Sequence, residues 1–368
     1  MFIENLKIRS FCNLKDLNLK FNPNLNVFSG NNAQGKTNII EAIYYLNKSK
    51  SFRKKKDQDL IQWNKNIFFL KGDIVNNNDI HQISILFQDF KKEIKINNKK
   101  ITKQNQVFNL FHCVIFSPKD LHILDKDPTI RRYFINLLIS QINEKYLYHL
   151  KKYHKTLLSR NKILIDKRSF FKKDKILESL DNILVKEGVE VIKIRNEVIN
   201  ELNKIVSGFY KEILPTKDLF EVKYKPFIFS DNLEKEFYDK LYKYKEYELR
   251  RGFTLVGPHK DDLIFSFKGV NIGNFGSRGQ KKMAAIAIRF GELYYIYKKT
   301  EKFPILLLDD MFSELDQEKK RNFTRLLNNQ IQMFITTTNL EFLRNMGFAN
   351  YSFFSVKDGD VLKNEEKR

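Results

Sequence analysis

Residues Gly30-Asn31-Asn32-Ala33-Gln34-Gly35-Lys36-Thr37 fit the spacing of a phosphate-binding P-loop at every position. A segment with strand character, Asn26-Val-Phe-Ser29, precedes the loop, and a helical pattern from about residue 38 to residue 46 follows it. The glycines allow consecutive backbone N–H groups to point at phosphates, and the positive end of the following helix favours an anion. We therefore expect residues 30–37 to bind ATP, with Lys36 at the β- and γ-phosphates and the Thr37 hydroxyl on Mg²⁺.

A second motif lies far along the chain, where Phe303-Pro-Ile-Leu-Leu-Leu-Asp309-Asp310 follows the pattern of a Walker B strand. Four consecutive apolar residues favour a strand that is buried in a sheet. The acidic residue at the end of that strand is placed to reach the shell of Mg²⁺, and we assign this metal role to Asp309. Asp310 stands where a carboxylate that polarises water is expected, so Lys36 and Asp310 are the candidate catalytic residues.

Two shorter motifs flank the Walker B strand. Gly276-Ser277-Arg278-Gly279-Gln280 directly precedes a helical pattern, and a Ser-x-Gly-Gln turn at the start of a helix is a second anion site. One nucleotide does not need two γ-phosphate sites in one chain, so we expect Ser277, Gly279 and Gln280 to cap ATP held by a partner subunit. The run from Ser313 to Asp316 has the pattern of the loop that crosses such a dimer interface, which adds Ser313 and Asp316 to the predicted nucleotide site.

Composition narrows the class of protein. The 368 residues carry a formal net charge of +22, which favours a polyanionic partner, nucleic acid first, although Lys, Asn and Ile are also the residues that AT-rich coding favours. No apolar stretch reaches the length of about 18 residues that a membrane span needs. Cys12 and Cys113 have no motif partners and the N-terminus does not have the layout of a secretion signal, so we expect a cytoplasmic protein.

Hydrophobic spacing divides the chain into three parts. Residues 1–118 and residues 250–368 carry the patterns of strands and of the helices next to the motifs, and we expect them to form one ATPase head. Residues 119–249 have apolar side chains three and four apart, including the series Val191, Ile194, Val198, Leu202, Ile205 and Phe209. We predict an α/β fold, an ABC-type P-loop ATPase head assembled from both chain ends with an inserted helical arm, a short antiparallel coiled coil.

The combined motifs resemble the bacterial RecF family of DNA replication and repair proteins over nearly the whole chain. The P-loop and Walker B strand are shared with the wider class of ABC-type ATPases, whereas the block Gly257-Pro258-His259-Lys260-Asp261-Asp262 is more specific to RecF. Other segments that carry the resemblance are Ser51-Phe52-Arg53, Phe116-Ser-Pro-Lys-Asp-Leu121, Arg131-Arg132 and Gly276-Ser-Arg-Gly-Gln280.

The resemblance implies a function in recombinational repair and replication-fork maintenance. It implies an ATP-dependent homodimer that binds DNA at duplexes next to single-strand gaps and works with RecO and RecR to help load RecA. It also implies that residues 30–37 bind ATP, that Asp309 binds Mg²⁺, that Asp310 assists hydrolysis and that Ser277 to Gln280 act on the partner's nucleotide.

Two further expectations concern rate and DNA contact. We expect a weak, DNA-stimulated ATPase. Asp310 is one methylene shorter than the glutamate common in faster ABC enzymes, so hydrolysis should be slow. The candidate DNA contacts are basic clusters after the P-loop helix and at the arm tip, namely Lys48, Lys50, Arg53, Lys54, Lys55, Lys56 and residues 167–175; each is equally consistent with a solvated charged face. The stripe Leu233, Phe237, Leu241 and Tyr244 favours core packing.

Alternatives stay open at this point. A Rad50/SMC-type head inserts hundreds of coiled-coil residues, whereas the helical insert here is much shorter. An ABC transporter subunit would need a transmembrane partner, and the block at residues 257–262 argues against it. A P-loop kinase would not need the turn at residues 277–280 or the loop at residues 313–316. An ATP-gated scaffold that does not hydrolyse ATP is a further interpretation, and the cluster at His259, Asp261 and Asp262 invites a metal site but favours a structural turn.

Overall fold

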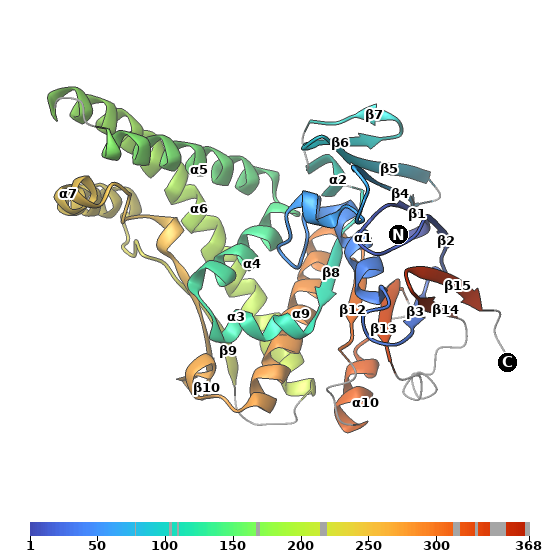
Figure 1. Cartoon of the computed structure of the whole chain (residues 1–368). Coiled ribbons are helices and arrows are strands. Elements are labelled where there is room, and N and C mark those ends of the chain that lie inside the picture. The colour runs from blue at the N-terminus through green and yellow to red at the C-terminus, as the bar shows by residue number, and fades with distance from the viewer. Residues whose placement is uncertain are drawn as a thin grey trace. The chain divides into compact units, whose positions relative to one another are not determined.

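The computed structural model describes residues 1–368 except 78, 103–104, 109, 167–169, 214–218, 312–316, 328–329, 339–350 and 365–368. The chain forms two compact units, one of residues 1–120 with 288–368 and the other of residues 121–287 (Figure 1). The first unit is therefore assembled from both ends of the sequence, and the second is inserted between them.

A six-stranded sheet in the first unit carries the P-loop and Walker B segments. Its order is β15-β14-β3-β13-β12-β8, and its neighbours are parallel except for the terminal hairpin β14–β15 (Figure 1). Its strands are β3 (Leu25–Ser29), β8 (Cys113–Phe116), β12 (Ile305–Asp309), β13 (Met333–Thr337), β14 (Tyr351–Lys357) and β15 (Asp360–Asn364). Every residue of β8, β12 and β13 is buried, as expected for strands covered on both faces.

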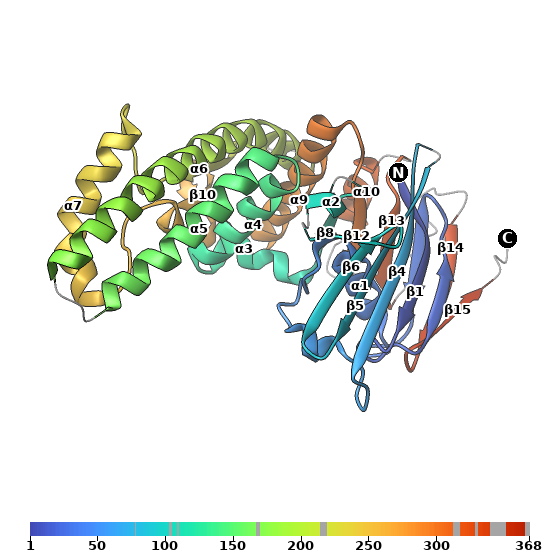
Figure 2. The same ribbon diagram turned by 90° about the horizontal axis from the view of Figure 1, so that it is seen from above.

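A second six-stranded sheet in this unit is antiparallel, in the order β2-β1-β4-β5-β6-β7. Figure 2 labels its strands β1, β4, β5 and β6. Its strands are β1 (Phe2–Arg9), β2 (Leu17–Lys20), β4 (Ile67–Asn76), β5 (Asp79–Gln88), β6 (Lys91–Ile96) and β7 (Lys99–Lys100). Helix α1 (Lys36–Lys48) packs against strands of both sheets, and one hydrophobic core includes Leu6 of β1, Ile43 of α1 and Leu307 of β12. Shorter helices complete the unit: η1 (Asp57–Leu60), α2 (Asn105–Phe108) and α10 (Gln317–Arg325), with η2 (Pro118–Leu121) at its boundary.

The second unit is mainly helical. Its helices are α3 (His122–Asp125), α4 (Pro128–Ser140), α5 (Glu144–Ile165), α6 (Phe170–Ile213), α7 (Leu233–Arg251), η3 (Pro258–Lys260) and α8 (Ile272–Phe275), and α9 (Arg278–Thr300) begins in it. A three-stranded antiparallel sheet, β11-β10-β9, completes it, with β9 (Phe220–Lys225), β10 (Asp262–Phe267) and β11 (Val270–Asn271).

Helices α5 and α6 pack side by side as the predicted helical arm (Figure 2). The predicted apolar series is buried at Val191, Ile194, Val198 and Leu202, but its last two members were placed one residue early. The buried side chains of α6 beyond Leu202 are Val206, Tyr210 and Ile213. Strand β9 lies along this end of the helix, and Tyr210 stacks on Phe220 at a centroid distance of 4.8 Å.

The α/β class with a head from both chain ends and an inserted helical region is confirmed. The compact division differs from the expected boundary at residue 250, because residues 250–287 pack within the second unit. Strand β10 pairs with β9 from Asp262↔Lys225 to Phe267↔Phe220, which ties this segment to the helical unit. The stripe on α7 packs as predicted, with Phe237 and Leu241 buried in one cluster.

Candidate nucleotide-binding site

The P-loop joins β3 to α1 and has the conformation that its glycines permit. Gly35 has a φ of 120°, and a Cβ there would lie 3.0 Å from both Asn13 Oδ1 and Leu14 Cδ2. Asn13 also bonds both sides of the loop, because its amide donates to the Ala33 carbonyl at 3.4 Å and its Oδ1 accepts from Asn38 at 2.6 Å. The loop therefore needs glycine at residue 35, and Asn13 is a supporting residue that the sequence motif did not include.

Lys36 lies at the mouth of the loop. Its Nζ donates to the carbonyls of Gly30 at 2.6 Å and Asn31 at 2.8 Å. The residue is only 7% exposed, and burial lowers the pKa of the amine, opposed by the nearby charges of Asp310 and Asp309. The ammonium is thus held at one place by the loop, in position to meet a phosphate.

Thr37 and Asp309 come together although one motif lies at each end of the chain. The Thr37 hydroxyl donates to Asp309 Oδ1 at 2.8 Å, and the Thr336 hydroxyl donates to the same oxygen at 2.9 Å. Burial raises the pKa of Asp309, while the two hydroxyl donors act in the opposite direction. Asp309 is thus a buried carboxylate that two hydroxyls hold in place, and its oxygens are of the kind that could hold a hard cation.

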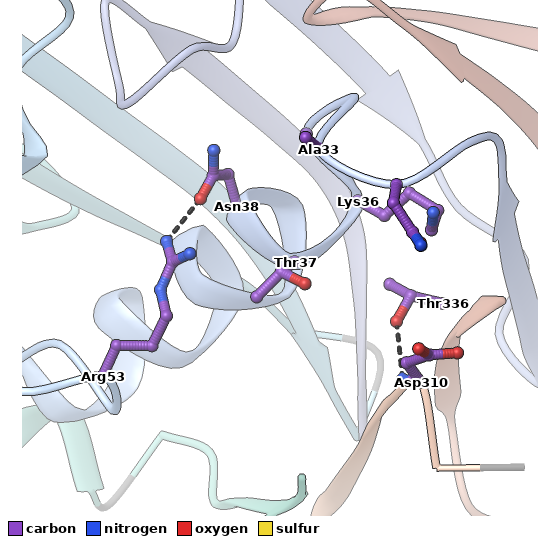
Figure 3. Close-up of a pocket in the computed structure, with 9 residues that line it drawn as sticks. Ala33, Lys36, Thr37, Asn38, Arg53, Asp310 and Thr336 are labelled. Carbon is purple, nitrogen blue, oxygen red and sulfur yellow. Dashed lines mark hydrogen bonds between the residues drawn. The ribbon is translucent and has the colours of Figure 1, made fainter. Parts of the chain in front are cut away.

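Asp310 follows in a left-handed backbone conformation, with a φ of 48°. Its N–H donates to Thr336 Oγ1 at 2.9 Å. Asp310 lines one pocket together with Lys36, Thr37 and Thr336, as Figure 3 shows. Sparsely populated backbone conformations of this kind cost free energy and cluster at functional sites. The structure therefore brings both predicted catalytic residues, Lys36 and Asp310, to the same pocket.

Arg53 was predicted as a DNA contact, but it lines this pocket instead. Its guanidinium donates to Asn38, as Figure 3 shows, and to Glu41. Glu41 is 0% exposed and also accepts from Ser51. The buried Glu41 carboxylate draws the arginine inward. The Ser51-Phe52-Arg53 motif was the signal that could have placed Arg53 here.

Lys48 was also predicted as a DNA contact, and the structure contradicts this. The residue is 2% exposed, and its Nζ lies 5.1 Å from the centroid of the Phe108 ring. Burial lowers its pKa, and the charge of Glu292 favours the protonated form. Lys48 ends α1 on the side that faces the core, so only the exposed lysines at residues 50 and 54–56 stay available to an external partner.

The terminal hairpin β14–β15 supports the P-loop, which the sequence did not predict. The N–H of Gly359 donates to the Gln34 carbonyl at 3.0 Å, and the N–H of Asp358 donates to Gln34 Oε1 at 2.5 Å. A Cβ on Gly30 would lie 2.2 Å from the carbonyl oxygen of Val356. Gln34 and Gly30 therefore hold the loop against the hairpin.

Ser277 and Gln280 form a capping box at the start of α9 in the second unit. The N–H of Gln280 donates to Ser277 Oγ at 3.2 Å, and the N–H of Ser277 donates to Gln280 Oε1 at 2.9 Å. Gly279 is exposed, its φ is not in the left-handed region, and the nearest atom to an added methyl would be Ser277 Oγ at 4.0 Å. The fold of this chain therefore does not itself require glycine at residue 279.

Some predicted residues lie outside the described residues. Ser313 and Asp316, predicted to cross a dimer interface, fall in residues 312–316, and part of the predicted basic arm tip falls in residues 167–169.

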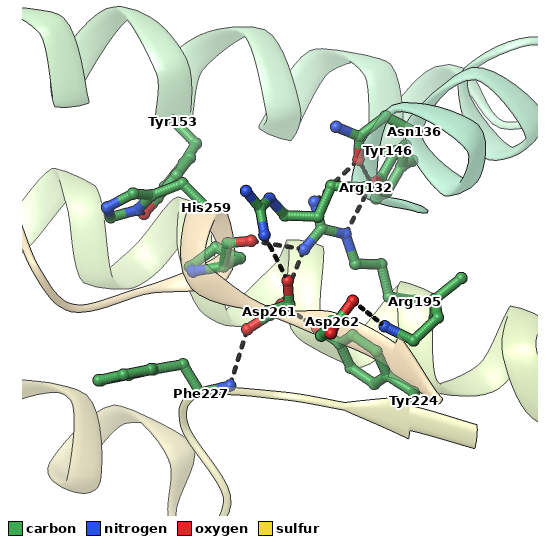
Figure 4. Close-up of polar contacts among 12 residues, drawn as sticks. Arg132, Asn136, Tyr146, Tyr153, Arg195, Tyr224, Phe227, His259, Asp261 and Asp262 are labelled. Carbon is green, nitrogen blue, oxygen red and sulfur yellow. Dashed lines mark hydrogen bonds and ion pairs between the residues drawn. The ribbon is translucent and has the colours of Figure 1, made fainter. Parts of the chain in front are cut away.

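The block from Gly257 to Asp262 organises a buried polar network in the second unit (Figure 4). Asp261 is 1% exposed and accepts from Arg195 Nη1 at 2.7 Å, from the Phe227 N–H at 2.8 Å and from the Tyr224 hydroxyl. His259 Nδ1 lies 2.6 Å from the Tyr153 hydroxyl, and burial lowers the pKa of His259 to about 4. This network supports the structural interpretation of the block. No group of three metal-ligating side chains occurs among the residues that the structure describes.

Arg195 completes the network from α6. It is 2% exposed and donates to the Pro258 carbonyl at 2.7 Å, to Asn136 Oδ1 at 2.8 Å and to the Tyr146 hydroxyl at 3.0 Å (Figure 4). One guanidinium thus joins α4, α5, α6 and η3. Among the described residues of both units, no helix is long and apolar enough to cross a bilayer.

Known proteins resemble this chain over nearly its whole length. The family model of the RecF/RecN/SMC N terminal domain matches residues 2–361. The DNA replication and repair protein RecF of Clostridium perfringens (strain SM101 / Type A) is 37% identical over 364 residues, covering 98% of this chain and 99% of that protein. RecF of Clostridium kluyveri is 35% identical over 365 residues, covering 99% of this chain and 100% of the relative.

Two solved structures are also similar to this chain. A structure of the recombination mediator protein RecF-ATP in the RecFOR pathway superposes with a TM-score of 0.91 at 30% identity, covering 99% of this chain and 98% of that one. An Smc head bound to the C-winged helix domain of ScpA shares the fold alone, with a TM-score of 0.58 at 15% identity. From the P-loop, the Walker B strand, the capping box and these similarities together, the chain belongs to the RecF family of DNA replication and repair proteins.

Proposed function

We propose that the chain is an ATP-driven homodimer that binds DNA at single-strand gaps and duplex junctions. The observation that carries the proposal is the hydrogen-bonded group of Thr37, Asp309 and Thr336 beside the loop-held amine of Lys36. The similar solved structure is described as RecF-ATP and as a recombination mediator in the RecFOR pathway. By that similarity we propose RecO and RecR as partners in loading RecA in the cytoplasm.

Residues 30–37 hold the triphosphate in this proposal. Backbone N–H groups of the loop and the positive end of α1 face the phosphates, and no acidic residue occupies the first turn of α1 to oppose them. Lys36 contacts the β- and γ-phosphates. The oxygens of Thr37 and Asp309 are the hard ligands that Mg²⁺ prefers, and they fit that ion. When bound, Mg²⁺ neutralises charge on the phosphate oxygens.

Asp310 orients the attacking water. Its backbone is fixed by the N–H bond to Thr336, but its carboxylate reaches one methylene less far than a glutamate would. A misplacement of about 1 Å can cost roughly a hundredfold in rate. We therefore propose that hydrolysis is slow and times the release of DNA. An ATP-gated scaffold without hydrolysis is the alternative, and a phosphate-release assay separates the two.

The capping box of a second copy completes the site. The N-terminus of α9 offers backbone N–H groups and the Ser277 hydroxyl to the γ-phosphate of the partner. Ser277 and Gly279 are exposed, which supports an external ligand at this turn. Gly279 adds support, because a glycine that the chain's own fold does not need is suited to close approach by another molecule.

The test is sedimentation of the wild type and of Lys36→Ala, with and without ATP, Mg²⁺ and a gapped duplex. We expect the wild type to sediment as a dimer with ATP and to shift further with gapped DNA, whereas Lys36→Ala stays monomeric. A wild type that remains monomeric at saturating ATP, or a Lys36→Ala variant that dimerises equally well, would contradict the proposal.

A further inference from the structure

Two exposed aromatic side chains lie at the tips of neighbouring turns in the first unit. Trp63, the only tryptophan of the sequence, is 90% exposed, and Phe90 is 79% exposed. Trp63 precedes β4, Phe90 joins β5 to β6, and Ile67 of β4 pairs with Gln88 of β5. Because paired strands lie about 4.8 Å apart, the two turns occupy the same end of one sheet.

The turn at Phe90 has a residue that turn chemistry disfavours. Asp89 and Phe90 have φ values of 49° and 60°, the left-handed pair of a two-residue hairpin loop. Other two-residue loops with such φ values place asparagine or glycine second: Asn97-Asn98, Lys268-Gly269 and Asp358-Gly359. A phenylalanine here strains the backbone, and its exposed ring gains little packing in return. The ring is therefore better explained by an external ligand than by folding.

The turn at Trp63 presents its ring in a similar way. The N–H of Lys65 donates to the Gln62 carbonyl at 3.1 Å, and Asn64 has a φ of 63°, so Trp63 occupies the corner of a closed turn. The N–H of Gln62 donates to the Ser10 carbonyl at 2.9 Å, which anchors the turn to the end of β1. Trp63 is thus exposed by a defined turn.

Exposed lysines lie close to both turns in the sequence. Lys65 and Lys91 are exposed beside Trp63 and Phe90 respectively, and residues 54–56 are three further exposed lysines. Lys92 of β6 connects the β5–β6 hairpin to the segment that contains residues 54–56. Its Nζ bonds Asp57 at 2.8 Å and the Ser49 carbonyl at 2.6 Å. We name the combined surface the aromatic edge; its members are Lys54, Lys55, Lys56, Trp63, Lys65, Phe90 and Lys91.

We propose that the aromatic edge binds single-stranded nucleic acid, with bases stacked on Trp63 and Phe90 and phosphates beside the lysines. Unpaired bases stack on exposed aromatic rings whatever their sequence, and a basic surface follows the backbone. The interior bases of a duplex are already stacked on one another, so rings at turn tips select a single strand. The inference rests on the proposed action on DNA and names the strand that this surface binds.

Trp63 itself reports on the binding. Its fluorescence is followed while full-length protein with ATP and Mg²⁺ is titrated with oligo(dT), and we expect saturable quenching. Phe90→Asn removes the second ring and suits the turn, so we expect it to fold normally and to bind oligo(dT) roughly tenfold more weakly. The matched control is Phe229→Ala, because Phe229 is also exposed, at 83%, but lies in the second unit; we expect no change.

A labelled duplex, followed by anisotropy in the same mixtures, separates the two proposals. If the duplex binds with ATP but oligo(dT) leaves Trp63 fluorescence unchanged, the aromatic edge is wrong and the proposed function stands. The aromatic edge is equally wrong if Phe90→Asn binds oligo(dT) as tightly as the control, or if a blunt duplex quenches Trp63 as strongly. If no DNA binds the wild type with ATP, the proposed function fails.

Discussion

The hydroxyl of Thr37 donates a hydrogen bond of 2.8 Å to the carboxylate of Asp309, although 272 positions separate the two residues. Strand β13 lies between β3 and β12 in the sheet, and its Thr336 donates to the same oxygen. The site therefore forms only when strands from the two ends of the chain pair in this order. We therefore expect the site to assemble together with the sheet that carries it.

Asp309→Asn should separate stability from nucleotide binding. An amide oxygen can still accept from Thr37 and Thr336, while the buried charge is lost. Because burial raises the pKa of Asp309, the folded state favours the protonated carboxyl, and that contribution to stability is lost as pH rises through the raised pKa. We therefore expect the ligand-free variant to be at least as stable as the wild type at pH 7, with Mg²⁺-dependent ATP affinity strongly reduced.

Thermal unfolding tests the direction of this pH dependence. Both proteins are unfolded at about pH 4, near the pKa of an unfolded aspartate, and at pH 7. The advantage of Asp309→Asn should grow from the lower pH to the higher. An advantage that shrinks as pH rises would show that the carboxylate charge stabilises the ligand-free protein.

Gly279→Ala tests the approach of a second molecule to α9. The added methyl has its nearest neighbour 4.0 Å away, and alanine favours a helix by up to about 1 kcal/mol over glycine, so the monomer should be as stable or more stable. ATP-dependent dimerisation should weaken by ~1–3 kcal/mol if the partner's phosphates lie against this turn. Sedimentation equilibrium measures this.

Gly208→Ala is the matched control for that variant. Gly208 lies in α6 with no atom within 4 Å of an added methyl, so the same substitution should leave dimerisation unchanged. Equal dimerisation of both variants would place the partner's nucleotide elsewhere.

Arg195→Met should destabilise the second unit by about 3–5 kcal/mol, because it leaves the buried Asp261 carboxylate without its cation. Arg131→Met is the milder comparison, since the Arg131–Asp262 pair is partly exposed, with side chains at 12% and 24%. Chemical denaturation followed by circular dichroism measures the free energy of unfolding of both variants and of the wild type. If Arg195→Met costs no more than Arg131→Met, the network does not carry the stability inferred from its geometry.

Much of the first unit was predictable, because local patterns determine it. Each element can be identified from its own residues, without knowing which segments it packs against. Examples are the spacing of the P-loop, the four apolar residues before Asp309 and the strands with alternating apolar residues. The prediction that Lys36, Thr37, Asp309 and Asp310 meet also followed, since both motifs end strands of one sheet.

The rest depends on contacts between distant segments. The sequence around Asp358 and Gly359 does not indicate that their N–H groups bond Gln34. The sequence around Lys48 likewise does not indicate that its side chain faces the core. Arg53 was misplaced for the same reason: a run of basic residues predicts a charged surface, but the buried Glu41 carboxylate turns one member inward.

The central claim is that each nucleotide site is completed by a second chain, and mixing two inactive variants tests it most directly. Lys36→Ala lacks its own phosphate ligand, and Ser277→Arg blocks the cap that it offers to a partner. In a mixed dimer, one site has both an intact Lys36 and an intact Ser277. The account predicts that phosphate release by the mixture rises clearly above the sum of the separate variants, and a rate equal to that sum would contradict it.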